Sequence, residues 1–294
     1  MRRVRDLSGS PDLRIIGPQG CGKTTFMATL AYWPNARQDS PIESVKPFDD
    51  DSGKLIDMAQ DILENGLPLA GTLYDVSDPN NLPLYTLLIE LKPAFRLLRN
   101  IRFQVSCREY AGELIDDLCK KGMANPILDR YLEDCAEASG LLILIDGTAK
   151  EDQRYSQAFV NLKAELNLPF SGNENKNRRK SYRIAVVFSK AEQAQVWNYR
   201  YKIKQFVDLK FPKTKDCIQQ WCREWQCSAN YFFCSAFGMI NSPPTPNVKV
   251  QKREKGGTYG VIAKPKYWRP FGLVAPIYWL HTGIDESRLR KIEE

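Results

Sequence analysis

The chain has 294 residues, of which 43% are hydrophobic and 26% charged, and its formal net charge is +7. This size suits one soluble globular domain with a sizeable core and excludes two full domains of usual length. The N-terminus lacks the apolar stretch of a signal peptide, and no apolar run approaches the ~20 residues that a membrane helix needs, so we expect a cytoplasmic protein without a membrane span.

The first predicted elements surround a glycine-rich segment. A short apolar strand, 13–16, runs directly into GPQGCGKTT, and the helix that follows is predicted to stop before Pro34. Residues 34–52 are interpreted as loop because they are rich in Pro, Ser and Asp. An amphipathic helix is predicted over 54–64, ended by Asn65-Gly66, with another loop from 68 to 83.

Apolar runs then alternate with helical patterns along the rest of the chain. The runs 84–91 and 102–107 are close enough in sequence for antiparallel neighbouring strands. Further strands are predicted at 141–145, 183–189 and 231–236, and helical segments near 114–118, 151–167, 195–226 and 273–280. Two basic clusters, around 176–180 and 249–255, fall in polar segments between these elements. Each is interpreted as a solvated loop, so nucleic-acid binding through them is not favoured.

Alternating strands and helices predict an α/β fold with a mostly parallel sheet, helices on both faces and one antiparallel edge strand. We expect this three-layer P-loop NTPase sandwich to form a single domain over 13–294, after a tail at 1–12. Insertions are predicted near 34–83, 168–182 and 241–268.

The glycine-rich segment fits GxxxxGK[ST] at every position, between a strand and a helix as a P-loop requires. Glycines let the backbone curl so that several N–H groups point at phosphate oxygens. Lys23 is expected to neutralise the β and γ phosphates, and the Thr24 hydroxyl to coordinate Mg²⁺. The predicted nucleotide-binding residues of this loop are Gly17, Gly20, Cys21, Gly22, Lys23, Thr24 and Thr25.

The motifs after the P-loop resemble those of P-loop GTPases of the translation-factor and Ras-like class. Strand 102–107 leads into Glu109-Tyr-Ala-Gly112-Glu113, which is similar to the DxAGQ motif of that class. The resemblance implies that Glu109 takes the place of the aspartate that holds magnesium, and that the Gly112 N–H meets the γ-phosphate. It also implies that Glu113 replaces the glutamine that orients the attacking water. A carboxylate beside phosphate puts fast intrinsic hydrolysis in doubt.

The same resemblance extends to the base-recognition motifs. Strand 183–189 leads into Ser189-Lys190-Ala191-Glu192, similar to NKxD, with a glutamate in place of aspartate. The resemblance implies that Glu192 accepts hydrogen bonds from N1–H and N2–H₂ of guanine, and that the stem of Lys190 covers the base. Ser235-Ala236 keep the SA pair of the family's SAK motif.

The resemblance also implies a γ-phosphate sensor, and Thr72 lies in the corresponding loop. The expected catalytic residues are thus Lys23, Glu113 and Thr72, and the expected metal ligands are Thr24, Glu109 and Thr72. FGLVAPIYWL (271–280) is similar to the closing helix of the paired bacterial "double-GTPase" proteins, a group that family context links to conflict or defence operons. The implied cofactors are GTP or GDP and Mg²⁺.

Partners are predicted less sharply. The apolar stripe of helix 54–64 could dock a protein partner, for which a second GTPase-like subunit is one candidate, or could pack on its own domain.

Eight cysteines show no regular spacing. Those from Cys217 to Cys234 include no CxxC pair, and the only histidine, His281, is distant in sequence, so zinc binding is not favoured.

Two alternatives stay open at the level of sequence. Asp146 ends the apolar strand LLILID and could serve as the Walker B aspartate of an ATPase, although no glutamate follows it. The chain could also be a nucleotide-loaded scaffold that never turns over.

Overall fold

The computed structural model describes residues 12–67, 83–95, 102–108, 114–120, 125–167, 170, 172, 175–252 and 258–291. Its centre is a seven-stranded sheet in the order β2-β3-β4-β1-β5-β6-β7. These strands are β1 (Asp12–Ile16), β2 (Ile42–Pro47), β3 (Leu84–Leu91), β4 (Arg102–Arg108), β5 (Gly140–Asp146), β6 (Arg183–Ser189) and β7 (Ser228–Phe233).

The sheet is mostly parallel, as predicted. β1 pairs in parallel with β4 and β5, β6 pairs in parallel with β5 and β7, and β3 alone runs antiparallel to its two neighbours, β2 and β4. The predicted antiparallel strand is therefore present, but β2 lies outside it at the edge. Residues of β2 fell in a predicted loop because IESVKP is short and flanked by prolines, which edge positions tolerate.

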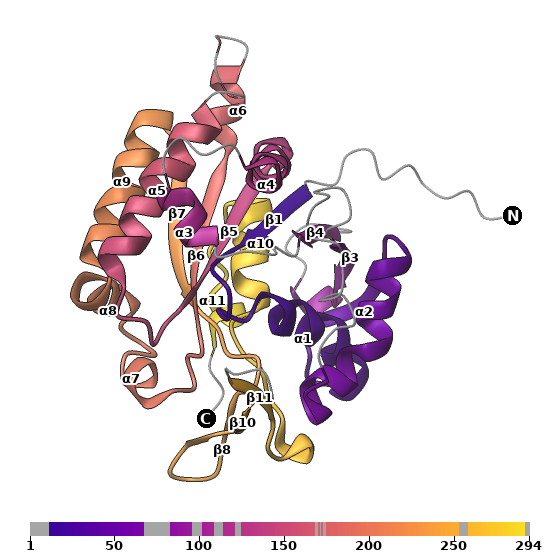
Figure 1. Ribbon diagram of the computed structural model, residues 1–294. Helices are drawn as coiled ribbons and strands as arrows, with labels where there is room; N and C mark the ends of the chain where they lie inside the picture. The colour runs from indigo at the N-terminus through magenta and orange to yellow at the C-terminus, as the bar shows by residue number, and fades with distance from the viewer. Residues whose placement is uncertain are drawn as a thin grey trace, which may run out of the picture.

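Helices cover both faces of the sheet (Figure 1). One face is covered by α1 (Lys23–Ala36), α2 (Asp50–Gln60) and α10 (Val274–Thr282), and the other by α3 (Leu114–Cys119), α4 (Pro126–Glu137), α5 (Asp152–Asn167), α8 (Ile203–Lys210) and α9 (Pro212–Trp225). Strand β5 shows how the layers are held. Leu142 and Leu144 belong to the apolar cluster on one face, whereas Leu141, Ile143 and Ile145 belong to the cluster on the other. A strand buried on both faces explains its uninterrupted apolar run.

Two predicted helix boundaries are wrong. α1 continues through Pro34 to Ala36, because a proline in the last turn removes only one backbone hydrogen bond and the Arg37 N–H still reaches the Trp33 carbonyl at 3.0 Å. α2 begins before residue 54 because Asp49 caps it, accepting from the Ser52 N–H at 2.8 Å. It continues into a π-helical turn, η1 (Asp61–Asn65), which ends at Gly66 as expected.

The segments predicted as insertions contain short elements. The predicted insertion 34–83 contains β2, α2 and η1, and the predicted insertion 168–182 contains α6 (Lys176–Ser181). The third, 241–268, holds β9 (Thr245–Pro246), β10 (Val248–Lys252), β11 (Thr258–Ile262) and η6 (Pro265–Tyr267). β9 pairs antiparallel with β8 (Met239–Ile240), which begins just before this insertion, and β10 pairs antiparallel with β11. The remaining short elements are η4 (Pro93–Phe95), α7 (Ala194–Trp197) and α11 (Ser287–Arg290). None of the helices within the described ranges is long and apolar enough to cross a membrane.

The insertion near 241–268 is anchored beside the end of β7. Trp268 stacks on Tyr32 of α1 with ring centroids 5.4 Å apart, and its indole N–H donates to the Ala236 carbonyl at 2.7 Å. Isolated bridges also join Ser235 to Phe271 and Gly238 to Arg269. The insertion therefore leaves and rejoins the domain next to the predicted SA motif.

Candidate nucleotide-binding site

The phosphate loop connects β1 to α1 and has the backbone form that its glycines predict. Gly20 and Gly22 have φ angles of 74° and 96°, in the left-handed region that favours glycine. Gly22 precedes the first turn of α1, which has no side-chain cap and no acidic residue. The N–H groups of this turn and its partial positive charge therefore favour an anion.

Gly17 is required for a different reason. A Cβ at this position would lie 2.3 Å from the Leu144 carbonyl oxygen and 2.8 Å from the Cys21 sulfur. The loop therefore rests directly on β5, and a side chain at residue 17 would push it away. Cys21 is itself buried, and burial raises the pKa of its thiol. Cys21 can contribute to ligand binding through its backbone.

Lys23 is held against its own loop. Its side chain is only 8% exposed, and Nζ donates to the carbonyl oxygens of Gly17 at 2.8 Å and Pro18 at 3.1 Å. An ammonium group has three donors, so these bonds fix its position and leave one for a phosphate oxygen. Thr24 and Thr25 follow in the first turn of α1, both partly exposed.

The loop after β6 is tied to the phosphate loop by Ser189. Its hydroxyl oxygen lies 2.7 Å from the Cys21 carbonyl oxygen and 3.2 Å from that of Ile145. This buried hydroxyl was not predicted as a site residue. Its place as the first residue of the NKxD-like motif was the available signal, but the tie to Cys21 depends on tertiary structure.

Lys190 follows Ser189 with a φ of 56°, and its ammonium forms an ion pair with Asp146 at the end of β5. The other Asp146 oxygen accepts from the N–H and the hydroxyl of Thr148, at 2.8 and 2.7 Å. The Lys190 stem was expected to cover the base, and here the Asp146 carboxylate sets the direction of its ammonium.

Glu192 and Ser235 are brought together from the ends of β6 and β7. Glu192 is 2% exposed, and hydrogen bonds from Ser235 and Gln193 reach its carboxylate. Oε2 is buried without a hydrogen-bond partner in the described part of the chain. Burial raises the pKa of this carboxyl group. Because the group is enclosed, a base can reach it only if the Glu192 side chain or the Ser235 segment moves.

The Ser235–Ala236 segment is fixed on both sides. The Ser235 hydroxyl accepts from the Gly238 N–H at 2.8 Å, and the Ala191 N–H donates to the Cys234 carbonyl at 3.1 Å. The two predicted base loops therefore contact one another, and Ser189 joins them to the phosphate loop.

Four predicted site residues lie outside the described residues: Thr72, Glu109, Gly112 and Glu113. Their roles stay predictions. Of the three expected metal ligands only Thr24 is described, and within the described ranges no group of three His, Cys, Asp or Glu side chains is placed to hold a metal ion. A hydroxyl in the first turn after a P-loop lysine fits the Mg²⁺ ligand that such loops supply.

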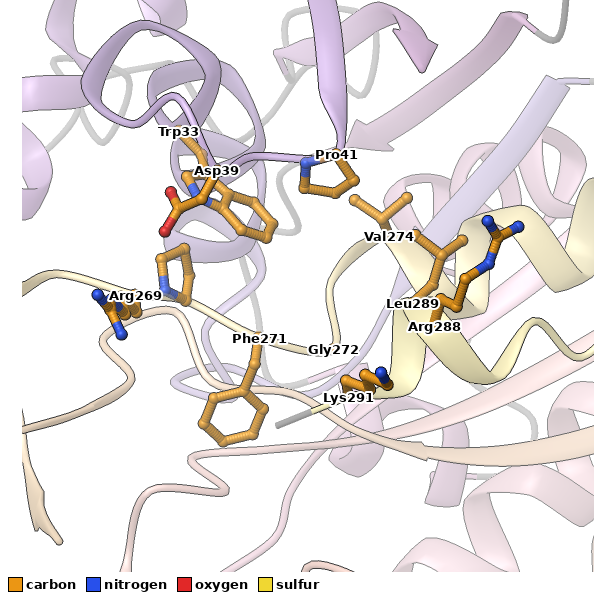
Figure 2. A pocket seen from close by; sticks show the side chains of 11 residues that line it. Trp33, Asp39, Pro41, Arg269, Phe271, Gly272, Val274, Arg288, Leu289 and Lys291 are labelled. Atoms are coloured by element: carbon orange, nitrogen blue, oxygen red, sulfur yellow. The ribbon is translucent and has the colours of Figure 1, made fainter. Parts of the chain in front are cut away.

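A separate pocket of about 90 Å³ lies between the end of α1, the segment 269–274 and α11. Figure 2 shows Trp33, Asp39 and Pro41 on one side of it, and Val274 and Leu289 on another. No residue of the phosphate loop lines it. The pocket is therefore distinct from the candidate nucleotide site.

No protein-family model matches the chain. No curated protein matches it either. Among solved structures, the chain is similar to a dimerization-deficient mutant of Toc33 from Arabidopsis thaliana, with 12% identity, a TM-score of 0.42 and coverage of 93% of this chain and 85% of that one.

Two further solved structures are similar to the chain. One is the signal recognition particle receptor SRb-GTP/SRX complex from Chaetomium thermophilum, with 11% identity, a TM-score of 0.39 and coverage of 78% of this chain and 92% of that one. The other is the GTP-bound Ski7 GTPase-like domain of S. cerevisiae, with 12% identity, a TM-score of 0.33 and coverage of 77% of this chain and 43% of that one. Similarity at this level does not transfer a function.

Proposed function

We propose that the chain binds a guanine nucleoside triphosphate with Mg²⁺ and acts as a slowly hydrolysing switch. The observation that carries this proposal is the contact of Ser189 with Cys21, because it makes the phosphate loop and the base loops one unit. Gly17 to Thr25 bind the phosphates, with Lys23 on the β and γ groups. Lys190, Glu192, Ser235 and Ala236 surround the base.

Guanine is favoured by the chemistry of Glu192. A carboxylate accepts from two adjacent donors, and guanine presents N1–H and N2–H₂ side by side, whereas adenine has no such pair. Oε2 of Glu192 is buried and unpartnered among the described residues, so a donor pair would satisfy an acceptor that is otherwise desolvated at a cost.

Magnesium would neutralise phosphate charge when bound, held by Thr24 with Glu109 and Thr72. Gly112 would contact the γ-phosphate, and Glu113 would lie where water attacks. A glutamate there adds negative charge beside phosphate, so slow turnover and stimulation by a protein partner are expected.

A switch requires two conformations that the γ-phosphate distinguishes. In the GTPase class that the motifs resemble, the segments that correspond to 66–85 and 108–118 flank the γ-phosphate. Hydrogen exchange should show selective protection of these segments with a non-hydrolysable GTP analogue relative to GDP. Identical exchange in both states would mean a static nucleotide binder.

The biological setting is part of the same proposal. The closing segment 271–280 supports placement with the paired GTPase-like proteins of bacterial conflict or defence systems, in the cytoplasm. A second GTPase-like subunit is then the natural partner. The apolar stripe of helix 54–64 packs on its own domain, with Leu55, Ala59 and Leu63 buried in the core cluster on the α1 face, so this stripe is not the docking face.

The ATPase alternative depends on Asp146. In the structure both of its carboxylate oxygens are engaged, one by Thr148 and one by Lys190. A Walker B aspartate must direct its carboxylate toward the metal, so this arrangement favours the GTPase-type assignment. The third possibility is a scaffold that binds nucleotide but does not hydrolyse it. A measurement of phosphate release distinguishes this scaffold from a slow GTPase, because only the GTPase releases phosphate.

The decisive experiment is a titration of the full chain with fluorescent GTP and ATP analogues, with and without Mg²⁺. The expected result is Mg²⁺-dependent binding with a preference for GTP. A preference for ATP would overturn the base assignment, and the absence of binding to both would overturn the phosphate site.

A further inference from the structure

The thiols of Cys222 and Cys227 are in contact where α9 passes into β7. Their sulfur atoms lie 3.6 Å apart, with Cys227 as donor and Cys222 as acceptor. Both side chains are partly exposed, so small molecules in solution can reach them. The pair precedes the first residue of β7, and the phosphate loop follows the last residue of β1. Because β1 and β7 run in the same direction, the thiol pair lies at the N-terminal ends of the parallel strands and the phosphate loop at their C-terminal ends.

The local backbone brings these residues together. α9 ends at Trp225, Gln226 takes a left-handed φ of 57°, and the Cys227 N–H then donates to the Cys222 carbonyl at 3.1 Å. This closure places the second residue after the helix, Cys227, over Cys222, which lies three residues before the last helical residue. Such positions often make an apolar contact. Here the two side chains are thiols, so the same closure pre-aligns a reactive pair.

The contact makes the two thiols chemically unequal. The S–H of Cys227 donates to Cys222 and lowers the pKa of the Cys222 thiol, and the same contact raises the pKa of Cys227. The C-terminal end of α9 disfavours negative charge, and Arg223 in its last turn offsets this. A thiolate is the nucleophilic form of cysteine, so Cys222 is the attacking group.

We propose that Cys222 and Cys227 form a thiol–disulfide exchange site whose substrate is a small, exposed disulfide such as oxidised glutathione. The Cys222 thiolate attacks one sulfur of the substrate, forms a mixed disulfide and releases one glutathione thiolate. Cys227 gives its proton to water, attacks the Cys222 sulfur and releases the second glutathione thiolate. Two protein thiols are oxidised by two electrons, and the substrate disulfide is reduced to two thiols.

The geometry allows the second step with little movement. A disulfide bond is ~2.05 Å long, so the two sulfurs must approach by about 1.5 Å, which side-chain rotation can supply. A metal site at this pair has less support, because within the described ranges no third Cys, His, Asp or Glu side chain joins it to form a possible metal cluster. The proposal is independent of nucleotide binding.

The test treats the reduced, folded full chain with oxidised glutathione, blocks the remaining thiols by alkylation, and measures intact mass over time. The wild type should take up two fewer alkyl groups than the untreated chain, without accumulating a glutathione adduct on Cys222 or Cys227. Cys227→Ser should retain a stable adduct on Cys222, because the resolving thiol is absent. The Cys222 adduct should form about tenfold faster than one on Cys119, the partly exposed thiol whose pKa burial raises.

Assignment uses trypsin, which cleaves after Arg223 and separates the two cysteines. Disulfide-linked peptides from the wild type should separate on reduction, and should persist in Cys217→Ala and Cys234→Ala variants. Cys119→Ser is the matched control and should leave disulfide formation unchanged. Equal adduct formation at Cys119 and Cys222, or no cross-link in the wild type, would overturn the proposal. The wild-type time course needs no variant, so a misfolded variant cannot decide the result.

Discussion

The Ser189 hydroxyl and the Cys21 carbonyl oxygen are 2.7 Å apart, and this contact joins the loop after β6 to the phosphate loop. We expect Ser189→Ala to lower the free energy of unfolding by about 1 kcal/mol, because it leaves a buried carbonyl without this donor. Triphosphate affinity should fall with it, since the phosphate loop loses a support. Thermal melts and nucleotide titrations check both. Ser181→Ala, which removes an exposed hydroxyl, should change neither the free energy of unfolding nor triphosphate affinity. An equal effect of the two substitutions would contradict a specific link between the loop after β6 and the phosphate loop.

Lys23 should dominate triphosphate affinity. Lys23→Ala removes a positive charge that the carbonyls of Gly17 and Pro18 hold in place, so the Kd for GTP should rise by about 100-fold or more. Isothermal titration measures the change, and circular dichroism checks the fold. Lys54→Ala on α2, whose side chain is 67% exposed, is the matched control. A folded Lys23→Ala protein with wild-type affinity would refute the phosphate site.

Base selectivity should depend on the charge of Glu192. Glu192→Gln keeps the size of the side chain but presents one acceptor and an amide donor in place of two acceptors. GTP affinity should therefore fall about tenfold to 100-fold while ATP affinity changes little. Competition between the two fluorescent analogues measures the ratio. An unchanged ratio would mean that Glu192 supports the Ser235 segment and does not read the base.

Glu192→Gln should lower GTP affinity but raise the stability of the fold near neutral and alkaline pH. Burial raises the pKa of Glu192 above its ordinary value of 4.5, so the folded chain binds a proton more tightly than the unfolded chain. Tighter proton binding by folded Glu192 stabilises the folded chain. This stabilisation is fully present below pH 4.5 and is lost as pH rises through the raised pKa. Glu192→Gln should thus melt at a higher temperature than wild type near pH 8, and the difference should shrink toward about pH 4. A constant difference across this range would contradict the burial argument.

Turnover by the isolated chain should be slow. The resemblance of 109–113 to the DxAGQ motif implies that Glu113 carries a negative charge where Ras-like GTPases place a neutral glutamine, so Glu113→Gln should release phosphate faster than wild type. A partner that supplies an arginine can accelerate such enzymes by up to ~10⁵-fold. Single-turnover phosphate release measures both rates. Rapid hydrolysis by the wild type alone would argue against this role for Glu113.

The sequence predicted those parts of the structure that local pattern determines. Strand β6 was placed at its observed bounds because RIAVVFS is apolar between polar neighbours. The phosphate loop was placed because GxxxxGK[ST] between a strand and a helix is a specific pattern, and Gly20 and Gly22 have the left-handed angles that favour glycine. The edge strand β2 was missed because its pairing with β3, not its composition, makes it a strand.

The missed site features arise from contacts between distant segments. The burial of Glu192 follows from packing against the end of β7, and the ion pair of Lys190 with Asp146 joins residues from two strands. The contact of Cys222 with Cys227 required Gln226 to adopt a left-handed angle that glycine or asparagine normally signals. Sequence spacing alone does not contain that information.

The bridges between Ser235 and Phe271 and between Gly238 and Arg269 close the insertion near 241–268 at its base. The two ends of this inserted segment therefore lie side by side next to the end of β7. Loop-closure entropy grows only slowly with length once the ends are fixed, so the exposed part of this segment can lengthen or shorten at small thermodynamic cost. Ile262 and Trp268 are buried in the core cluster on the α1 face, so the parts of the segment that carry them are constrained. Length variation between these bridges, with an unchanged sheet on either side, is thus the evolutionary pattern that homologous chains should display.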